Sequence, residues 1–141
     1  MNEEEIRERS LALVERSQIA FLGTLGEDGF PHVKALMKAE AEGIGVIWFS
    51  TNTSNRHVAQ LGRNPKASVY FVHHPQEPWH GLMLTGTVEL RQDRESRERL
   101  WEDGRERYYP LGVTDPDYTV MRFVAERGHF WQFGTRLEFE I

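Results

Sequence analysis

A strand, a polar turn, a short helix and a second strand follow one another within one stretch of the sequence, and this order constrains the fold most. The pattern predicts a strand at 44–49 and a helix from about 55 to 61, where Val58 and Leu61 share an apolar side. The Asn-Pro pair at 64–65 ends this helix, because a residue before proline is disfavoured in helical geometry. Residues 67–72 are β-branched and aromatic and predict the second strand.

The polar turn of this stretch carries hydroxyls and amides at Ser50, Thr51, Asn52, Thr53, Ser54 and Asn55. Arg56 follows in the first turn of the predicted helix. Backbone N–H groups at a helix N-terminus bind anions, and a guanidinium adds a bidentate contact, so the turn is a candidate phosphate site. An ordinary turn, with Ser54 capping the helix and Arg56 exposed, is the alternative that these residues leave open.

The overall charge argues against general nucleic-acid binding. The chain has a formal net charge of −5 and a pI of about 5.7, whereas nucleic-acid binders usually present a basic field. Residues 30–72 nevertheless carry five lysines and arginines against two glutamates. A small anionic ligand fits this local excess better than a polymer does.

The sequence has no cysteine, which excludes disulfides, thiolate metal sites and a cysteine nucleophile. Its N-terminus is acidic and polar where a secretion signal would be apolar. No apolar run approaches membrane-spanning length. We therefore expect a cytoplasmic protein without a membrane partner.

The remaining elements are predicted from periodicity. Asn2 and the glutamates after it start a helix that runs to about residue 16 and lies across the sheet. Closely spaced strands with turns between them predict an antiparallel barrel; they are expected at 19–25, 32–38, 82–90, 119–124, 129–133 and 137–141. We interpret 1–141 as a single domain of the mainly β class, a β-barrel with peripheral helices.

One predicted helix interrupts the strands at 93–107. Asp93 is its expected N-cap, and Glu95 with Arg99 is an expected i, i+4 ion pair. Leu100 and Trp101 are expected to face inward. The charged surface of this helix is interpreted as a solvated face.

Six motifs in a fixed order carry a family resemblance: F-P-H-V-K at 30–34, W-F-S-T-N at 48–52, S-N-R at 54–56, Q-L-x-x-N-P-K at 60–66, L-T-G-T-V-E-L at 84–90 and Y-Y-P-L-G-V-T-D-P-D-Y at 108–118. With them the chain resembles the FMN-binding split-barrel proteins of the pyridoxamine 5′-phosphate oxidase-like superfamily, in its general stress protein-like branch. The resemblance implies an antiparallel split barrel of Greek-key type. It also implies a homodimer with FMN in the subunit interface.

The resemblance also implies the cofactor-binding residues. They are Lys34, Ala35, Leu36, Met37, Lys38, Ser50, Thr51, Asn55, Arg56, His57, Gly81 and Trp131. The strand segment at 33–37 would line the flavin ring with its backbone, and Ser50, Thr51, Asn55 and Arg56 would surround the phosphate and ribityl chain. His57 stands where the oxidases proper carry lysine, which leaves Lys34 or Lys38 to supply the missing charge. For the two lysines, simple surface charge remains the alternative.

Aromatic residues near the C-terminus have two interpretations. Trp131 with Phe130 resembles the aromatic edge that covers the ring from the partner subunit, while core packing is the other account. Trp131 and Phe130, together with Trp79 and Phe133, present more aromatic surface than one small core is expected to bury. This excess favours an obligate dimer.

The activity that the resemblance implies is an FMN-dependent oxidoreductase acting on an unknown small molecule, with no side chain named as catalytic. A non-catalytic flavin, deazaflavin or haem carrier, or a stress-associated binding protein, is the alternative, and a cofactor-free interaction module is a third. The true oxidases continue beyond the segment matching 137–141 with an arginine- and histidine-bearing region. We therefore expect a protein that is not a strict pyridoxamine 5′-phosphate oxidase.

Other site classes are not favoured. The histidines at 73, 74 and 80, with Glu77 between them, lack a spacing that brings them to one metal. No dinucleotide fingerprint, P-loop or nucleophile elbow is present. We predict no metal site and no hydrolase activity.

Overall fold

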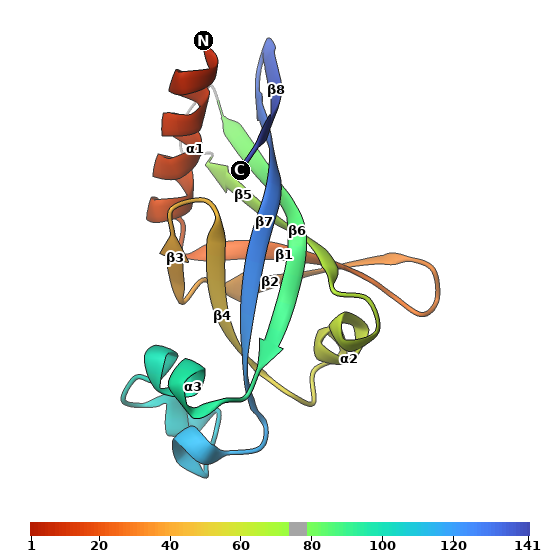
Figure 1. Ribbon diagram of the computed structural model, residues 1–141, viewed down its shortest axis with the longest axis vertical. Coiled ribbons are helices and arrows are strands. Elements are labelled where there is room, and N and C mark those ends of the chain that lie inside the picture. Colours follow the sequence, from red (N-terminus) through yellow and green to blue (C-terminus); the bar gives the residue numbers. More distant parts are fainter. Residues whose placement is uncertain (74–78) are drawn as a thin grey trace.

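The computed structural model describes residues 1–73 and 79–141. A mostly antiparallel sheet curls into a half-barrel with three α-helices, which confirms the predicted split-barrel fold class (Figure 1). The strands are β1 Ile19–Leu25, β2 Pro31–Met37, β3 Glu40–Glu42, β4 Val46–Asn52, β5 Lys66–His73, β6 His80–Arg91, β7 Tyr118–Gln132 and β8 Thr135–Glu140. The helices are α1 Glu3–Arg16, α2 Arg56–Arg63 and α3 Arg94–Leu100, with short 3₁₀ helices at Arg105–Arg107 and Gly112–Thr114.

The sheet curls back on itself at one end. Its strand order is β2-β1-β5-β6-β7-β4-β3, so β2 and β3 end this series of strands, and β8 is a further edge strand paired to β7. Strands β2 and β3 are close in sequence, and the N–H of Ala39 between them donates to Trp48 O of β4 at 2.9 Å. Within the described sheet β2 has only β1 as a strand neighbour. A cavity lined by residues of β1, β2 and α2 forms the opening that contains the candidate site.

The core fills the concave side of the sheet. Strand β1 alternates exposed and buried residues, as expected for a sheet with one buried face. Phe49, Phe71 and Phe123 are fully buried there, and α1 covers one end with Ile6 and Leu13. A second cluster packs α3 and the segment after it against the other end of the sheet; it contains Trp48, Leu100, Tyr109, Tyr118 and Val120.

Strand β7 is continuous where the sequence predicts two strands. Thr85 of β6 pairs with Arg127 while Gly86 pairs with Ala125, so Glu126 is the extra residue of a β-bulge. A polar Glu-Arg-Gly sequence typical of a turn therefore lies within a strand. The helix predicted at 93–107 is divided instead, because Gly104 adopts a left-handed conformation with φ 95° between α3 and the 3₁₀ helix.

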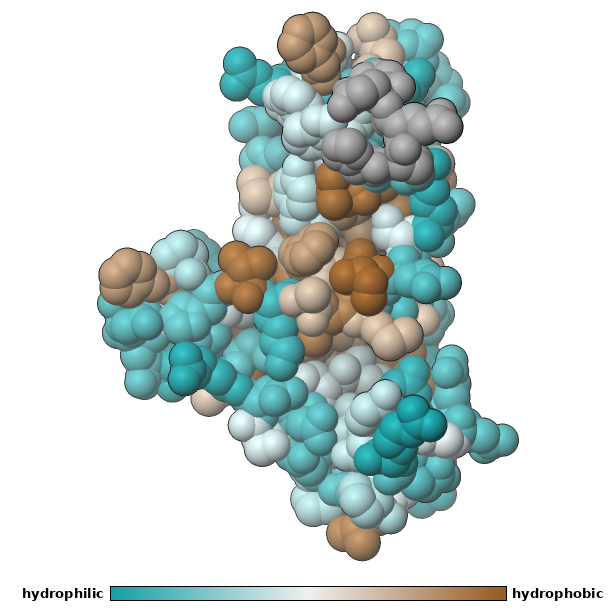
Figure 2. All heavy atoms as spheres, turned by 180° about the vertical axis from the view of Figure 1, so that it is seen from behind, coloured by the Kyte–Doolittle hydropathy of each residue, from teal (hydrophilic) through white to brown (hydrophobic). Residues whose placement is uncertain are grey.

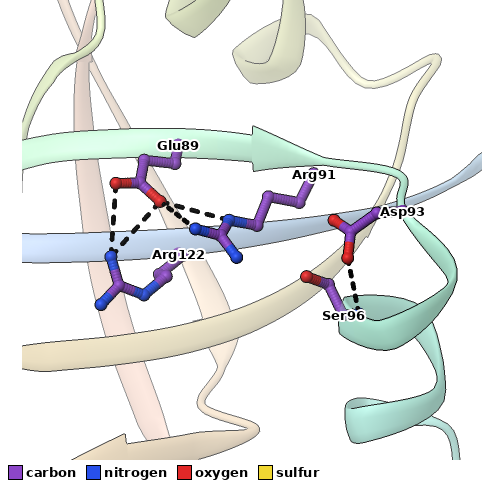
Figure 3. Close-up of polar contacts among 5 residues, drawn as sticks. All are labelled: Glu89, Arg91, Asp93, Ser96 and Arg122. Carbon is purple, nitrogen blue, oxygen red and sulfur yellow. Dashed lines mark hydrogen bonds and ion pairs between the residues drawn. The ribbon is translucent and has the colours of Figure 1, made fainter.

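Helix α3 is held at both ends by polar contacts. As predicted, Asp93 caps it by accepting a hydrogen bond from the Ser96 N–H at 3.0 Å (Figure 3). The predicted Glu95–Arg99 pair is wrong, because Arg99 donates to Glu40 and Glu42. Arg99 thereby joins α3 to β3.

Neighbouring strands are also joined by side chains beside α3. Glu89 of β6 accepts hydrogen bonds from Arg91 and from Arg122 of β7 (Figure 3). The Arg122 contact joins β6 to β7 near the start of α3.

Replacing Gly86 with alanine is expected to destabilise the protein by about 1–3 kcal/mol. A Cβ at this position would overlap Val124 O and crowd Ala125 Cα, which are backbone atoms that cannot rotate away. Urea unfolding measures the loss. Gly62→Ala is the matched control, because Gly62 lies in α2 with open space around it and alanine favours a helix by up to about 1 kcal/mol. An equal stability change for both variants would contradict this account of the bulge.

Candidate functional site

The polar turn is shaped by a residue far away in the sequence. Ser50, Thr51 and Asn52 are the last residues of β4, so the turn itself is shorter than predicted and spans 53–55. Asp117 accepts hydrogen bonds from Asn52 Nδ2 at 2.8 Å and from the Ser54 N–H at 2.9 Å. The Asn52 contact, followed by the Ser54 N–H, lowers the pKa of the Asp117 carboxyl.

Helix α2 begins without a side-chain cap. The alternative in which Ser54 caps it is wrong, because Ser54 Oγ pairs with Asp117 and Asn55 occupies the N-cap position. Asn55 makes no capping bond and donates from Nδ2 to Thr51 Oγ1 at 3.2 Å. Helices α1 and α3, in contrast, are capped by Asn2 and by Asp93. Val58 N–H in the first turn of α2 donates to the Asn55 carbonyl at 3.1 Å, whereas the N–H groups of Arg56 and His57 have no capping side chain.

Two cations flank this helix start. Arg56 and Lys34 form no ion pair or side-chain hydrogen bond with any residue that the structure describes, and both are exposed. Lys38 is placed differently, because its Nζ donates to the Val14 and Glu15 carbonyls at the end of α1. Burial lowers its pKa. Of the two lysines considered for the missing charge, Lys34 lies at the opening.

His57 lies buried beneath Thr51. Its Nε2 is 2.8 Å from Thr51 Oγ1, and because Asn55 already donates to this oxygen, the hydroxyl can donate to a neutral imidazole. Burial, and secondarily the charge of Lys34, lowers the pKa of His57 from 6.5 to about 4. At neutral pH His57 therefore carries no charge and holds Thr51 in place.

This burial makes stability depend on pH. The unfolded chain binds a proton on His57 near pH 6.5, whereas the folded chain resists protonation until about pH 4. Neutral His57 therefore makes its full contribution to the free energy of unfolding above pH 6.5. This contribution is lost as pH falls toward 4, and the loss is about 1–2 kcal/mol at pH 5. Urea unfolding at pH 7.5 and pH 5 gives the change in unfolding free energy between the two pH values. His57→Gln should remove the part of this change that His57 causes. The same pH-dependent change in unfolding free energy in parent and variant would contradict the conclusion that His57 is buried and neutral.

The predicted site residues gather around two cavities. One of about 200 Å³ lies between β1, β2 and α2 and is lined by Lys34, Arg56 and His57. The other, of about 590 Å³, is bounded by the ends of β2 and β4 and by residues 102–109; the predicted residues lining it are Leu36, Met37, Lys38, Ser50, Thr51 and Asn55. Ala35 lies between the two on β2 and is exposed on the convex side.

Gly81 and Trp131 lie away from both cavities. They form a cross-strand pair of β6 and β7, and the Tyr70 hydroxyl covers Gly81 so closely that a Cβ would overlap it. Trp131 stacks on Trp79 with ring centroids 4.4 Å apart. Phe130 is 2% exposed and belongs to the core, so for this residue the packing interpretation is confirmed.

The residues considered and not favoured as metal ligands are only partly described. His74 and Glu77 lie outside the described residues. The His73 and His80 rings meet edge to face, with ring centroids 5.6 Å apart. Within 1–73 and 79–141 no group of three or more His, Cys, Asp or Glu side chains could hold a metal ion.

Comparison with known proteins decides the family. The family model described as pyridoxamine 5′-phosphate oxidase matches residues 6–132. The chain belongs to this family. No curated protein matches the sequence. In the described part of this family member, no helix has the length and apolarity needed to cross a membrane.

Solved structures of related folds support the assignment. A protein related to general stress protein 26, of the pyridoxinephosphate oxidase family, from Clostridium acetobutylicum is 45% identical, with a TM-score of 0.87 over 99% of this chain and 97% of that one. A heme binding protein from Mycobacterium smegmatis is 17% identical, with a TM-score of 0.75 over 99% and 59% of the two chains. A FAD-binding protein from Mesorhizobium loti is 16% identical, with a TM-score of 0.69 over 92% and 94%. The last two share the fold.

Two parts of the site in this family member are not foreseen from the sequence. Gln60 is buried and accepts a hydrogen bond from Thr24 Oγ1 at 2.6 Å, which fixes α2 against β1. Residues 102–109 close the larger cavity although the sequence predicts a continuous helix there. For this segment Gly104 was the available signal, because glycine commonly ends helices.

Proposed function

We propose that this protein binds FMN in the opening between β2 and α2, and that it is an FMN-dependent oxidoreductase acting on a small molecule. The single observation that carries the proposal is the pair of unpaired cations, Arg56 and Lys34, beside the uncapped start of α2. Helix N-termini and guanidinium groups both favour phosphate. Membership of the pyridoxamine 5′-phosphate oxidase family supports a flavin rather than another phosphate ester.

The donor set fits the phosphate end of FMN. Arg56 offers charged N–H donors, Lys34 offers a second charge, and the backbone amides of Arg56 and His57 offer neutral donors. Ser50, Thr51 and Asn55 lie close by on β4 and the turn, where hydroxyl and amide groups suit the ribityl hydroxyls. Neutral His57 adds no charge and keeps Thr51 in position.

The ring of the flavin is proposed to lie along β2. The edge of β2 away from β1 has no strand neighbour in the described sheet, so its backbone can offer donors and acceptors to a planar ligand. Leu36 and Met37 add apolar contact. When bound, FMN supplies the redox chemistry, while the protein binds it, orients it and controls access to it.

We also propose a homodimer that places the cofactor in the subunit interface. The convex face of β1, β2 and β5 exposes a group of apolar side chains, which we call the apolar face; it consists of Ile19, Phe21, Val33, Met37 and Val72. Val33 and Met37 are 71% and 72% exposed. Figure 2 shows brown residues gathered across the middle of the molecule, on the side opposite to that of Figure 1. Such patches mark interfaces, and β2 belongs both to this face and to the site.

The test of the proposal is the chromophore of the purified protein. Its visible absorption spectrum should be that of a flavin, and the compound released by denaturation should co-migrate with FMN rather than FAD or riboflavin. Anaerobic addition of a nicotinamide donor should then bleach the flavin absorption. A haem spectrum, or no uptake of flavin by the chromophore-free protein, would contradict FMN binding. A bound flavin that no donor reduces would favour the carrier function instead.

A further inference from the structure

A third cavity lies on the convex side of the sheet. Its volume is about 390 Å³, which lies in the range of small-molecule sites. It begins beside the apolar face, at Gly23, and extends away from it across β5 and β6 to β7. None of the residues proposed to hold FMN lines it, and Thr24, which it shares with the smaller cavity, donates its hydroxyl hydrogen to Gln60 of α2. This cavity is therefore a separate candidate site.

Small residues and the β-bulge form the floor of this cavity. Gly23 of β1 pairs with Ser68 of β5, and Gly86 of β6 lies at the bulge. Because these residues have little or no side chain, the surface of the sheet is hollow here. The bulge adds Glu126 to β7, and Glu126 lines the cavity. Bulges near functional sites commonly re-aim a side chain in this way.

Two side chains of opposite charge line the cavity on opposite sides of β6. Lys66 belongs to β5, where it pairs with Thr87 of β6, and Glu126 belongs to β7. Neither side chain forms an ion pair or hydrogen bond with any residue that the structure describes. Strands β5 and β7 are two strand spacings apart, roughly 10 Å, so a ligand fits between the two charged ends. A ligand that carries both a positive and a negative charge would pair with both.

A hydroxyl group next to the bulge adds an acceptor for the positive end of such a ligand. Thr85 lines the cavity, and its Oγ1 is 3.4 Å from His129 Nε2. His129 Nδ1 lies 3.3 Å from Glu138 Oε1. A neutral imidazole that donates from Nδ1 to this carboxylate accepts at Nε2 from the Thr85 hydroxyl. The Thr85 oxygen then keeps its lone pairs for an ammonium group.

The remaining wall of the cavity is apolar. Leu25 and Pro31 are a cross-strand pair of β1 and β2 and line the cavity on the side of β5 away from β6. This wall suits the carbon chain of a small aliphatic molecule. A phosphate dianion fits less well, because the lining offers it one cation, Lys66, and opposes it with the carboxylate of Glu126.

We propose that this cavity binds a small aliphatic zwitterion, with Lys66 holding its carboxylate and Glu126 and Thr85 holding its ammonium group. The chemical class is that of small amino acids in which a short carbon chain joins the two charged ends. Both charged side chains are exposed, so water competes with the ligand, and the dissociation constant is expected in the millimolar range. The site does not depend on the flavin.

Calorimetric titration of the purified full chain with 4-aminobutyrate tests the site. The parent should bind one molecule per chain, and butyrate and n-butylamine, which each keep one charged end, should bind at least about 5-fold more weakly. Glu126→Gln should bind 4-aminobutyrate no more tightly than butyrate, because the partner of the ammonium group is gone. Lys66→Gln should likewise bind 4-aminobutyrate no more tightly than n-butylamine.

Gly23→Val tests the cavity rather than its charges. The nearest atoms to an added Cβ lie 3.7 Å away, which is ordinary contact, and the larger side chain then fills part of the floor. Binding of 4-aminobutyrate should be lost in this variant. Glu8→Gln is the matched control for Glu126→Gln, because Glu8 is exposed on α1 and does not line the cavity; it should bind as the parent does. Thermal unfolding shows that each variant is folded.

Three results would overturn the zwitterion site. The first is no saturable binding of 4-aminobutyrate by the parent. The second is parent-like affinity in the variants at Glu126, Lys66 and Gly23. The third is binding of butyrate or n-butylamine to the parent as tightly as 4-aminobutyrate, because one charged end would then suffice.

Discussion

Arg56→Ala is expected to weaken FMN binding by roughly one to two orders of magnitude. The substitution removes a charge-assisted contact worth about 1.5–3 kcal/mol, while the first-turn amides of α2 remain. Riboflavin, which lacks the phosphate, should bind parent and variant equally. Because Arg56 is exposed and forms no ion pair or side-chain hydrogen bond with a described residue, thermal stability without cofactor should not change. Fluorescence titration of FMN and riboflavin into the cofactor-free proteins measures these affinities.

Arg63→Ala is the control for this experiment. Arg63 lies on the same helix and pairs with Glu27 at 2.9 Å on the surface, outside the smaller cavity. Its loss should leave FMN affinity near that of the parent. Equal FMN affinity in Arg56→Ala and the parent would remove Arg56 from the site and leave the turn as an ordinary connection.

Phe21→Asp is expected to dissociate the proposed homodimer. Phe21 lies at the centre of the apolar face, between Ala35 of β2 and Tyr70 of β5, and is 37% exposed. An unpaired carboxylate buried in an interface costs about 3–5 kcal/mol, so the dimer dissociation constant should rise by roughly 100-fold or more. Light scattering at micromolar concentration should then report a monomer. Weaker FMN binding should accompany the loss of the partner.

Phe133→Asp tests whether the interface is the apolar face or the aromatic residues near the C-terminus that the sequence analysis names. Phe133 lies at the turn between β7 and β8 and is 84% exposed, so the same substitution there should leave the dimer intact. Circular dichroism confirms that both variants are folded. A dimer that survives Phe21→Asp would show that the apolar face is not the interface.

Local patterns predict most of the fold. The capping sequences at Asn2 and Asp93 place two helix starts correctly, because each cap depends on residues within one turn. The bulge at Gly86 and the long strand β7 are not predicted, because the Glu-Arg-Gly sequence resembles a turn until it is paired with β6. The apolar face is missed for a similar reason. Its members come from three strands and become one surface only when the sheet forms.

The site is predictable as far as its contacts are local. The turn, Arg56 and the strand at 34–38 are identified by sequence motifs, and the structure brings Lys34, Arg56 and His57 around one cavity. Lys38 is misjudged as a free charge because its partners are carbonyls at the end of α1. Asp117, which fixes the turn, lies 63 positions after Ser54 in the sequence, so only the fold reveals its role.

Native mass spectrometry of the protein reconstituted with FMN tests the central claim most directly. The account predicts a dimer that carries two FMN molecules, because each chain supplies one opening between β2 and α2 and shares the apolar face with its partner. A monomer with bound FMN would contradict the interface. A dimer that carries no FMN, when FMN is supplied in excess, would contradict the cofactor site.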